Sequence, residues 1–152
     1  KALAAGGAQQ DQRVAAQAWL GRAQLGQGQW FLAAVVPPLA KAEAIAREMG
    51  YPEVLAETAQ LHGDLELAQD EPDYHRLLAH YAEALLQAQA FNGVTLARTV
   101  AYLVDLLTAI AADGQGEAAA QMAVDLVRLG REMGVKETAV AALRQLAEKL
   151  VG

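Results

Sequence analysis

The tetrapeptide Arg47-Glu48-Met49-Gly50 occurs again further along the chain as Arg131-Glu132-Met133-Gly134. Halfway between the starts of the two copies lies the segment Gln89-Ala90-Phe91-Asn92. We call the distance from Arg47 to Gln89 the repeat step. Each segment follows an Ala- or Leu-rich stretch and has a large apolar residue, Met or Phe, in its third place. The repeat step, about 42 residues, falls within the spacing of about 20–50 residues that is typical of repeat proteins. The sequence therefore predicts an internal helical repeat; the alternative is an Ala-rich helical bundle without repeats.

The last residue of each segment predicts a helix end at that place. Glycine tolerates the left-handed backbone of a helix cap, and asparagine adopts it more easily than most residues. We therefore expect left-handed caps at Gly50, Asn92 and Gly134. A second register supports the period, because His62-Gly63-Asp64-Leu65 precedes the similar segment Leu103-Val104-Asp105-Leu106 by almost the same step.

Ala and Leu dominate the composition of this 152-residue chain, with 35 and 22 copies. Both are strong helix formers, whereas the strand-favouring residues Val, Ile and Thr number only 12, 2 and 5. The length suits one domain. The sequence predicts a single all-α domain over residues 1–152. Because the chain starts without Met, we interpret it as a fragment of a larger protein.

Breaks in the helical spacing of apolar residues divide the chain into helix pairs. Gly-rich or acidic breaks fall at residues 26–29, 69–73 and 113–116, as expected for turns between antiparallel helices. We expect three hairpins, at about 10–50, 51–92 and 93–134, and a closing helix at 136–151. A hairpin cannot bury its apolar face alone, so the hairpins are expected to stack.

Pro37 and Pro38 interrupt the return helix of the first hairpin. Proline inside a helix removes an amide donor and clashes with the preceding turn, at a cost of ~3 kcal/mol or more. Two interpretations follow: a separate short helix over residues 30–36, or one kinked helix with a gap beside it. We expect a kink or a split at this place.

Residue types that carry covalent or metal chemistry are scarce. The chain has no Cys and no Ser, which argues against disulfides, thiol enzymes, Cys-based zinc sites and Ser-nucleophile hydrolases. The three histidines show no metal-ligand spacing, because His75 and His80 diverge on one predicted helix and His62 lies on another. We expect no enzyme activity, metal or cofactor. We expect His62 to pack between helices and the other two to be exposed.

The charge balance bears on partners and compartment. A formal net charge of −6 with only four Lys argues against direct nucleic-acid binding. The apolar stretch at residues 25–40 contains two Gln and two Pro, so it is unsuited to span a membrane. No secretory leader is visible, and we expect a cytoplasmic location.

Two motifs resemble the tetratricopeptide-like repeat family. Leu20-Gly21 and His62-Gly63 are similar to the Leu-Gly pair in the first helix of that family's unit, and Tyr81 with Ala84 to the aromatic and Ala of its second helix. The long period and the Arg-Glu-Met-Gly helix ends resemble the C-terminal effector-binding arrays of large bacterial signal-responsive transcription activators. The resemblance implies a right-handed α-solenoid in which the first helix of each pair lines a concave wall.

Polar residues of the predicted first helices form a candidate strip on that wall. In the second unit they are spaced i, i+3, i+7 and in the third i, i+4, i+7, so each set shares one helix face. A strip of mixed charge suits a peptide or protein segment better than a phosphate; the alternative is a solvated helix face. The candidate partner-binding residues are Arg22, Glu57, Gln60, Asp64, Arg98, Tyr102 and Asp105.

We therefore expect a non-catalytic module that docks a protein or peptide segment on its concave face. In its parent protein it would serve sensing or assembly in a bacterial regulator, which is what the resemblance implies. One alternative is a structural domain that self-associates, for which the uncovered end near Val14, Ala18 and Leu25 would provide a homo-oligomer contact. The other is an enzyme or small-molecule effector sensor with a closed apolar pocket, for instance beside Pro37 and Pro38.

Overall fold

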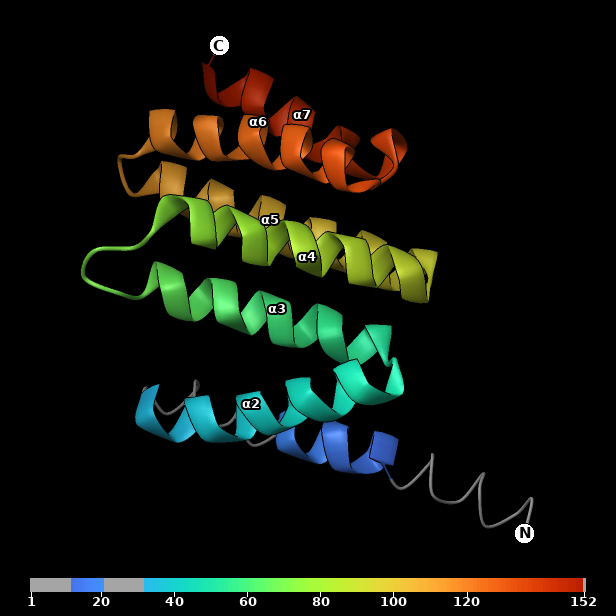
Figure 1. The fold of residues 1–152 in the computed structure, drawn as a ribbon. Coiled ribbons are helices and arrows are strands. Elements are labelled where there is room, and N and C mark those ends of the chain that lie inside the picture. The colour runs from blue at the N-terminus through green and yellow to red at the C-terminus, as the bar shows by residue number, and fades with distance from the viewer. Residues whose placement is uncertain (1–11, 21–31, 152) are drawn as a thin grey trace, which may run out of the picture.

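The computed structural model describes residues 12–20 and 32–151, and every regular element in these two ranges is a helix (Figure 1). The all-α prediction is confirmed for this part of the chain. One helical segment covers residues 12–20. The others are α2 (Leu32–Met49), α3 (Pro52–Leu67), α4 (Tyr74–Phe91), α5 (Gly93–Ala112), α6 (Gly116–Met133) and α7 (Glu137–Val151).

The helix bounds follow the spacing found in the sequence. Helices α2, α4 and α6 have 18 residues each and begin at Leu32, Tyr74 and Gly116, so each starts one repeat step after the previous one. The turns between α3 and α4 and between α5 and α6 lie where the sequence breaks were found. Helix α5 begins at Gly93, where the third predicted hairpin starts, because Asn92 caps it directly after α4.

Each helix packs against its neighbours in sequence and, from α4 onward, also against the next helix but one. Helices α2, α3, α4 and α6 lie one above another in Figure 1, with α5 behind α4 and α7 behind α6. The contacts of α4 with α6 and of α5 with α7 bring helices of the same direction side by side. Helix α2 packs mainly on α3 and on residues 12–20.

The buried side chains form two clusters that meet at α3. The larger cluster holds Tyr81, Leu85, Leu103, Leu126 and Leu143 and joins α3 to α7. The smaller one is built from residues 12–20, α2 and one side of α3. Helix α3 serves both because Val54 and Leu55 face the smaller cluster, whereas Ala56 belongs to the larger one.

Two of the three expected left-handed caps are present. Gly50 and Gly134 have φ angles of 72° and 104°. The amide after each glycine donates to the carbonyl five residues back, Tyr51 to Ala46 over 2.9 Å and Val135 to Gly130 over 2.8 Å. The two bonds are separated by two repeat steps, like the copies of the Arg-Glu-Met-Gly motif itself.

The expectation for Asn92 is wrong. Its φ of −167° is extended, and its side chain instead accepts a hydrogen bond from the Thr95 amide over 2.7 Å. Asn92 therefore ends α4 and caps the N-terminus of α5 at once, because only one residue separates the two helices.

Helix α2 is continuous through both prolines, so the interpretation as a separate short helix before Pro37 is wrong. Pro37 is exposed, whereas Pro38 is buried beside Leu39, a member of the smaller cluster. Trp30 and Phe31, which belonged to the expected separate helix, lie outside the residues that the structure describes.

Candidate functional site

The hollow with the best fit to the predicted binding wall lies between α5 and α7. It has a volume of about 700 Å³. Helix α5 is the first helix of the third predicted unit, and α7 takes the equivalent place after it. The groove therefore lies between two helices for which the resemblance implies partner contact, although only Asp105 of the predicted strip lines it. We name it the α5–α7 groove; its lining is Gln89, Gly93, Leu96, Ala97, Val100, Ala101, Val104, Asp105, Lys136, Thr138, Ala139 and Ala142.

Small and apolar side chains make the floor of the groove. Leu96 and Val100 are buried beneath it, whereas Ala97, Ala101 and Ala142 are exposed on its walls. Alanine at these places leaves the helix backbones accessible to a bound chain. Among the helices of residues 12–20 and 32–151, α5 is the one that is long and apolar enough to cross a membrane, with a mean hydropathy of 1.6. Only 28% of that apolar window is buried, although α5 packs against α4, α6 and α7.

The two ends of the groove differ in charge. At the start of α5 the groove is lined by Lys136, whose amide donates to Gln89 Oε1 over 2.8 Å. The Gln89 side chain also donates to the Gly134 carbonyl over 3.0 Å, so it fixes the turn between α6 and α7. At the other end lies Asp105, twelve positions after Gly93 and exposed. The groove thus runs from a cation to an anion.

The structure disperses the seven predicted contact residues. Arg22 lies outside the described part of the chain. Asp105 lines the α5–α7 groove, whereas Arg98 is exposed on α5 and is not among the residues that line it. On α3, Glu57 is exposed and Gln60 is half-buried, and neither lines that groove.

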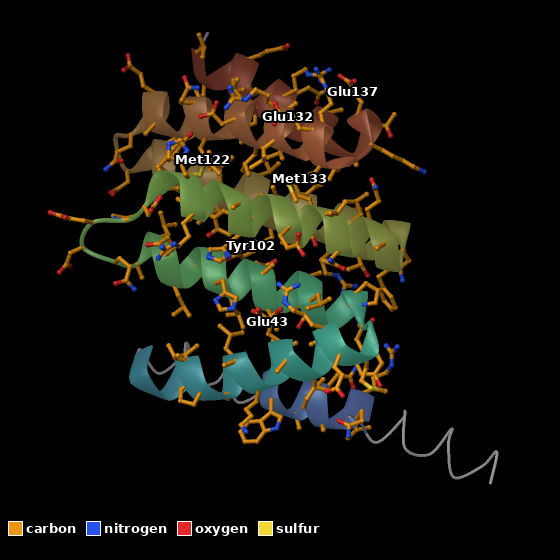
Figure 2. All side chains as sticks on the ribbon, viewed as in Figure 1. Glu43, Tyr102, Met122, Glu132, Met133 and Glu137 are labelled. Atoms are coloured by element: carbon orange, nitrogen blue, oxygen red, sulfur yellow. The ribbon has the colours of Figure 1, made fainter. Side chains whose placement is uncertain are left out.

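The structure brings Asp64 and Tyr102 together, but in a hydrogen bond between their own side chains. The Tyr102 hydroxyl donates to Asp64 Oδ2 over 2.6 Å, and the Tyr81 hydroxyl donates to Asp64 Oδ1 over 2.7 Å. Tyr102 lies between α3 and α4 in the view of Figure 2. Burial and the hydrogen bond to Asp64 raise the pKa of Tyr102 above its ordinary value, and burial and the charge of Asp64 do the same to the pKa of Tyr81. This carboxylate joins α3, α4 and α5, so its first role is structural.

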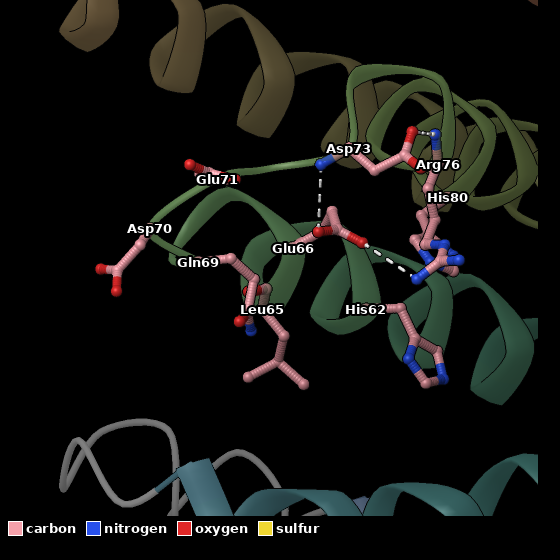
Figure 3. Close-up of a pocket in the computed structure, with 9 residues that line it drawn as sticks. All are labelled: His62, Leu65, Glu66, Gln69, Asp70, Glu71, Asp73, Arg76 and His80. Carbon is pink, nitrogen blue, oxygen red and sulfur yellow. Dashed lines mark hydrogen bonds and ion pairs between the residues drawn. The ribbon is translucent and has the colours of Figure 1, made fainter.

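A second, polar hollow of about 760 Å³ lies at the turn between α3 and α4 (Figure 3). Four acidic residues line it together with Arg76 and two histidines. The Arg76 guanidinium lies 3.8 Å from Glu66, and the Asp73 amide donates to Glu66 Oε2 over 3.3 Å. Asp73 in turn accepts from the Arg76 amide over 3.1 Å and caps α4. The acidic residues Glu66 and Asp73 thus hold the turn.

Histidine placement differs from the expectation in one respect. His75 is exposed as expected, but His80 is half-buried and stacks on His62, with ring centroids 5.1 Å apart. His62 Nε2 lies 2.6 Å from Glu43 Oε2, which links α2 to α3. His62 and His80 are each nine residues from Glu71, at the centre of the turn. Antiparallel packing of the two helices about that turn therefore predicts that the two rings lie side by side.

The electrostatics of this cluster oppose charge on His80. Burial and the nearby His62 lower the pKa of His80, against the pull of Glu66 and Glu43. Burial raises the pKa of Glu43, but the hydrogen bonds and charges of His62 and Arg47 outweigh it, and its net pKa lies below the ordinary value. Within the described ranges, no three His, Asp or Glu side chains are grouped closely enough to hold a metal ion.

Comparison with models of known protein families gives no match, and comparisons with curated proteins and with solved structures give no significant match.

Proposed function

We propose that the chain is a non-catalytic interaction module, built as a right-handed solenoid of tetratricopeptide-like hairpins, that docks a peptide or protein segment. The α5–α7 groove is the observation that carries this proposal, because it is open, apolar at its floor and polar at its ends. In its parent protein the module would serve as a cytoplasmic sensing or assembly domain of a bacterial regulator, by analogy with the arrays that it resembles.

The dimensions of the groove suit a short linear segment. Gly93 and Asp105 are separated by twelve helical residues, or about 18 Å. An extended peptide of about five or six residues covers that distance. Apolar side chains of such a peptide would rest on the exposed alanines, and its burial there would supply the affinity.

The charged ends would fix the direction of the bound segment. Lys136 at one end favours an acidic residue, and Asp105 at the other favours a basic one. Charge pairs at the rim of an interface contribute specificity and orientation more than affinity. The expected partner therefore carries opposite charges at the two ends of a short apolar stretch.

A peptide library displayed on phage tests the proposal. The library is selected on the wild-type chain, and the enriched peptides are measured by isothermal titration against wild type and Ala101→Arg. We expect micromolar binding that falls at least about tenfold in Ala101→Arg, because the longer side chain fills the groove. Ala40→Arg on α2, which is also an exposed alanine, is the matched control and should bind as wild type does.

Two results would contradict the proposal. One is the absence of any enriched peptide that binds in solution. The other is binding that Ala101→Arg leaves unchanged while amide chemical shifts move on α2 or α4 rather than on α5 and α7. Enrichment of peptides with the two charges reversed would contradict the direction but not the groove.

A further inference from the structure

The end of the helix stack at α6 and α7 has two adjoining hollows. One is about 590 Å³ and is lined by Val124, Val127, Arg144, Ala147, Glu148 and Val151. The other is about 430 Å³, and Val124 and Val151 line both. Val124 is 49% exposed and Val151 77% exposed. These two valines mark an apolar surface, which we name the end face.

The internal spacing shows what normally covers such a face. Val124 and Val127 lie one repeat step after Ala82 and Leu85 of α4, which are both 0% exposed. Helix α4 has α3, α5 and α6 packed against it, whereas α6 has α4, α5 and α7. Within the described ranges, no further helix packs against α6 in the way that α6 packs against α4. The end face is therefore equivalent in position to a part of α4 that is fully buried, and it has the character of a stacking surface.

We propose that the end face binds the same face of a second copy of this chain, about a two-fold axis. The charges on α7 are the reason for choosing a second copy as the partner. Arg144 and Glu148 both line the larger hollow, one turn apart on either side of Ala147. When two α7 helices pack antiparallel, Arg144 of each copy lies opposite Glu148 of the other, so the face is complementary to itself.

The side chains around this pair permit close approach. Ala147 lines the larger hollow and is small, so it leaves room for a second helix, and Val124 and Val151 of the two copies would cover one another. Arg144 also pairs with Glu137 of its own chain. Its guanidinium carries five N–H donors, so it can keep that contact and bind a second carboxylate. Apolar burial would supply the affinity and the charges the orientation.

The association is tested by sedimentation equilibrium of the whole chain over a range of concentrations. We expect a monomer–dimer equilibrium for wild type, with a Kd that rises at least about tenfold in Val124→Glu, because a carboxylate would be buried. Val94→Glu on α5 is the control, since Val94 is 69% exposed and lies away from the end face. Far-UV circular dichroism confirms that both variants are folded.

Charge reversal tests the two-fold geometry. Arg144→Glu and Glu148→Arg should each weaken dimerisation when alone, because like charges then face each other twice. An equimolar mixture of the two variants should dimerise as wild type does, since both facing pairs become attractive again. A folding defect cannot produce this recovery.

Three results would overturn the proposal. The first is a monomer at all concentrations up to about 1 mM, the range of weak association. The second is a dimer that neither Val124→Glu nor the charge reversals affect. The third is growth into filaments, which would indicate head-to-tail stacking on the opposite end of the molecule rather than a closed two-fold pair. The α5–α7 groove is separate from the end face, so peptide binding there can hold or fail independently.

Discussion

Gly63 of α3 lies directly against the ring of Tyr81 on α4. A Cβ atom built at Gly63 would be 2.5 Å from Tyr81 Cε1 and 2.7 Å from its Cδ1. Both residues are buried, so neither the ring nor the helix has free space to move into. The absence of a side chain at Gly63 is thus what lets the two helices approach, and it also places the Tyr81 hydroxyl against Asp64.

Replacing Gly63 by alanine should therefore destabilise the protein, although alanine favours a helix more than glycine does. Overpacking of a core typically costs ~1–3 kcal/mol, which exceeds the propensity gain of at most ~1 kcal/mol. Urea unfolding measures the difference. Gly116→Ala is the control: it is also a helical glycine, but a Cβ atom added there would meet no atom within 4 Å, so its stability should stay equal or rise. Equal stability of Gly63→Ala and wild type would show that the helices can separate freely.

Asp64 on α3 should couple energetically to Tyr102 on α5, because the two side chains share a hydrogen bond. Asp64→Ala leaves two hydroxyls without their acceptor, so we expect it to cost ~1–3 kcal/mol of unfolding free energy. Tyr102→Phe removes one of these two bonds. In the double variant the two effects should be less than additive by ~0.5–1.5 kcal/mol, since the second change removes a bond that is already lost. Asp105→Ala, at an exposed position of α5, should change stability by less than ~0.5 kcal/mol. Strict additivity of Asp64 and Tyr102 would contradict the network.

Helix positions could be predicted from the sequence because they depend on local signals. The turn residues at 69–73 and the glycines Gly50 and Gly134 each end a helix through their own backbone preferences. The repeat step placed α2, α4 and α6 because equivalent sequences fold alike. The cap at Asn92 was wrong because its conformation depends on how soon α5 begins, which is a property of the next helix.

Side-chain pairing could be predicted less well, because it depends on the rotation and distance of neighbouring helices. Asp64 has the spacing of an exposed strip residue, yet two hydroxyls from other helices reach it. His62 and His80 looked unrelated in helix numbering, yet the turn folds them together. In the sequence, only their equal distance from Glu71 indicates that the two histidines lie side by side. Asp105 is exposed on α5, and its contact with a partner stays a prediction.

Stability should fall as the solution is acidified, in two separate ranges of pH. The pKa of His80 in the folded protein lies below its ordinary 6.5, so the unfolded chain binds more protons and the free energy of unfolding decreases as pH falls from about 6.5 through the folded pKa. The pKa of Glu43 lies below its ordinary 4.5, so a second decrease begins below about pH 4.5. Urea unfolding between pH 8 and pH 3 measures both.

Variants separate the two ranges. His80→Asn should flatten the dependence near pH 6 and leave the lower range in place. Glu43→Gln should reduce the slope in the lower range, to which Glu137 with its lowered pKa also contributes. His75→Asn is the control, because His75 is exposed and lies outside the pair of stacked rings. If His80→Asn and wild type keep the same slope near pH 6, the stacked pair does not govern acid stability.

Pro37 should limit the stability of α2, because it is the sixth residue of an uninterrupted helix and lacks an amide donor. Its ring is exposed, so little packing is lost when alanine replaces it. We expect Pro37→Ala to raise the free energy of unfolding by ~1–3 kcal/mol, measured by urea unfolding. Pro52→Ala is the control, since Pro52 is the first residue of α3, where proline is tolerated and its removal should have no benefit. A loss of stability in Pro37→Ala would instead mean that the proline ring holds the start of α2 against the segment before it.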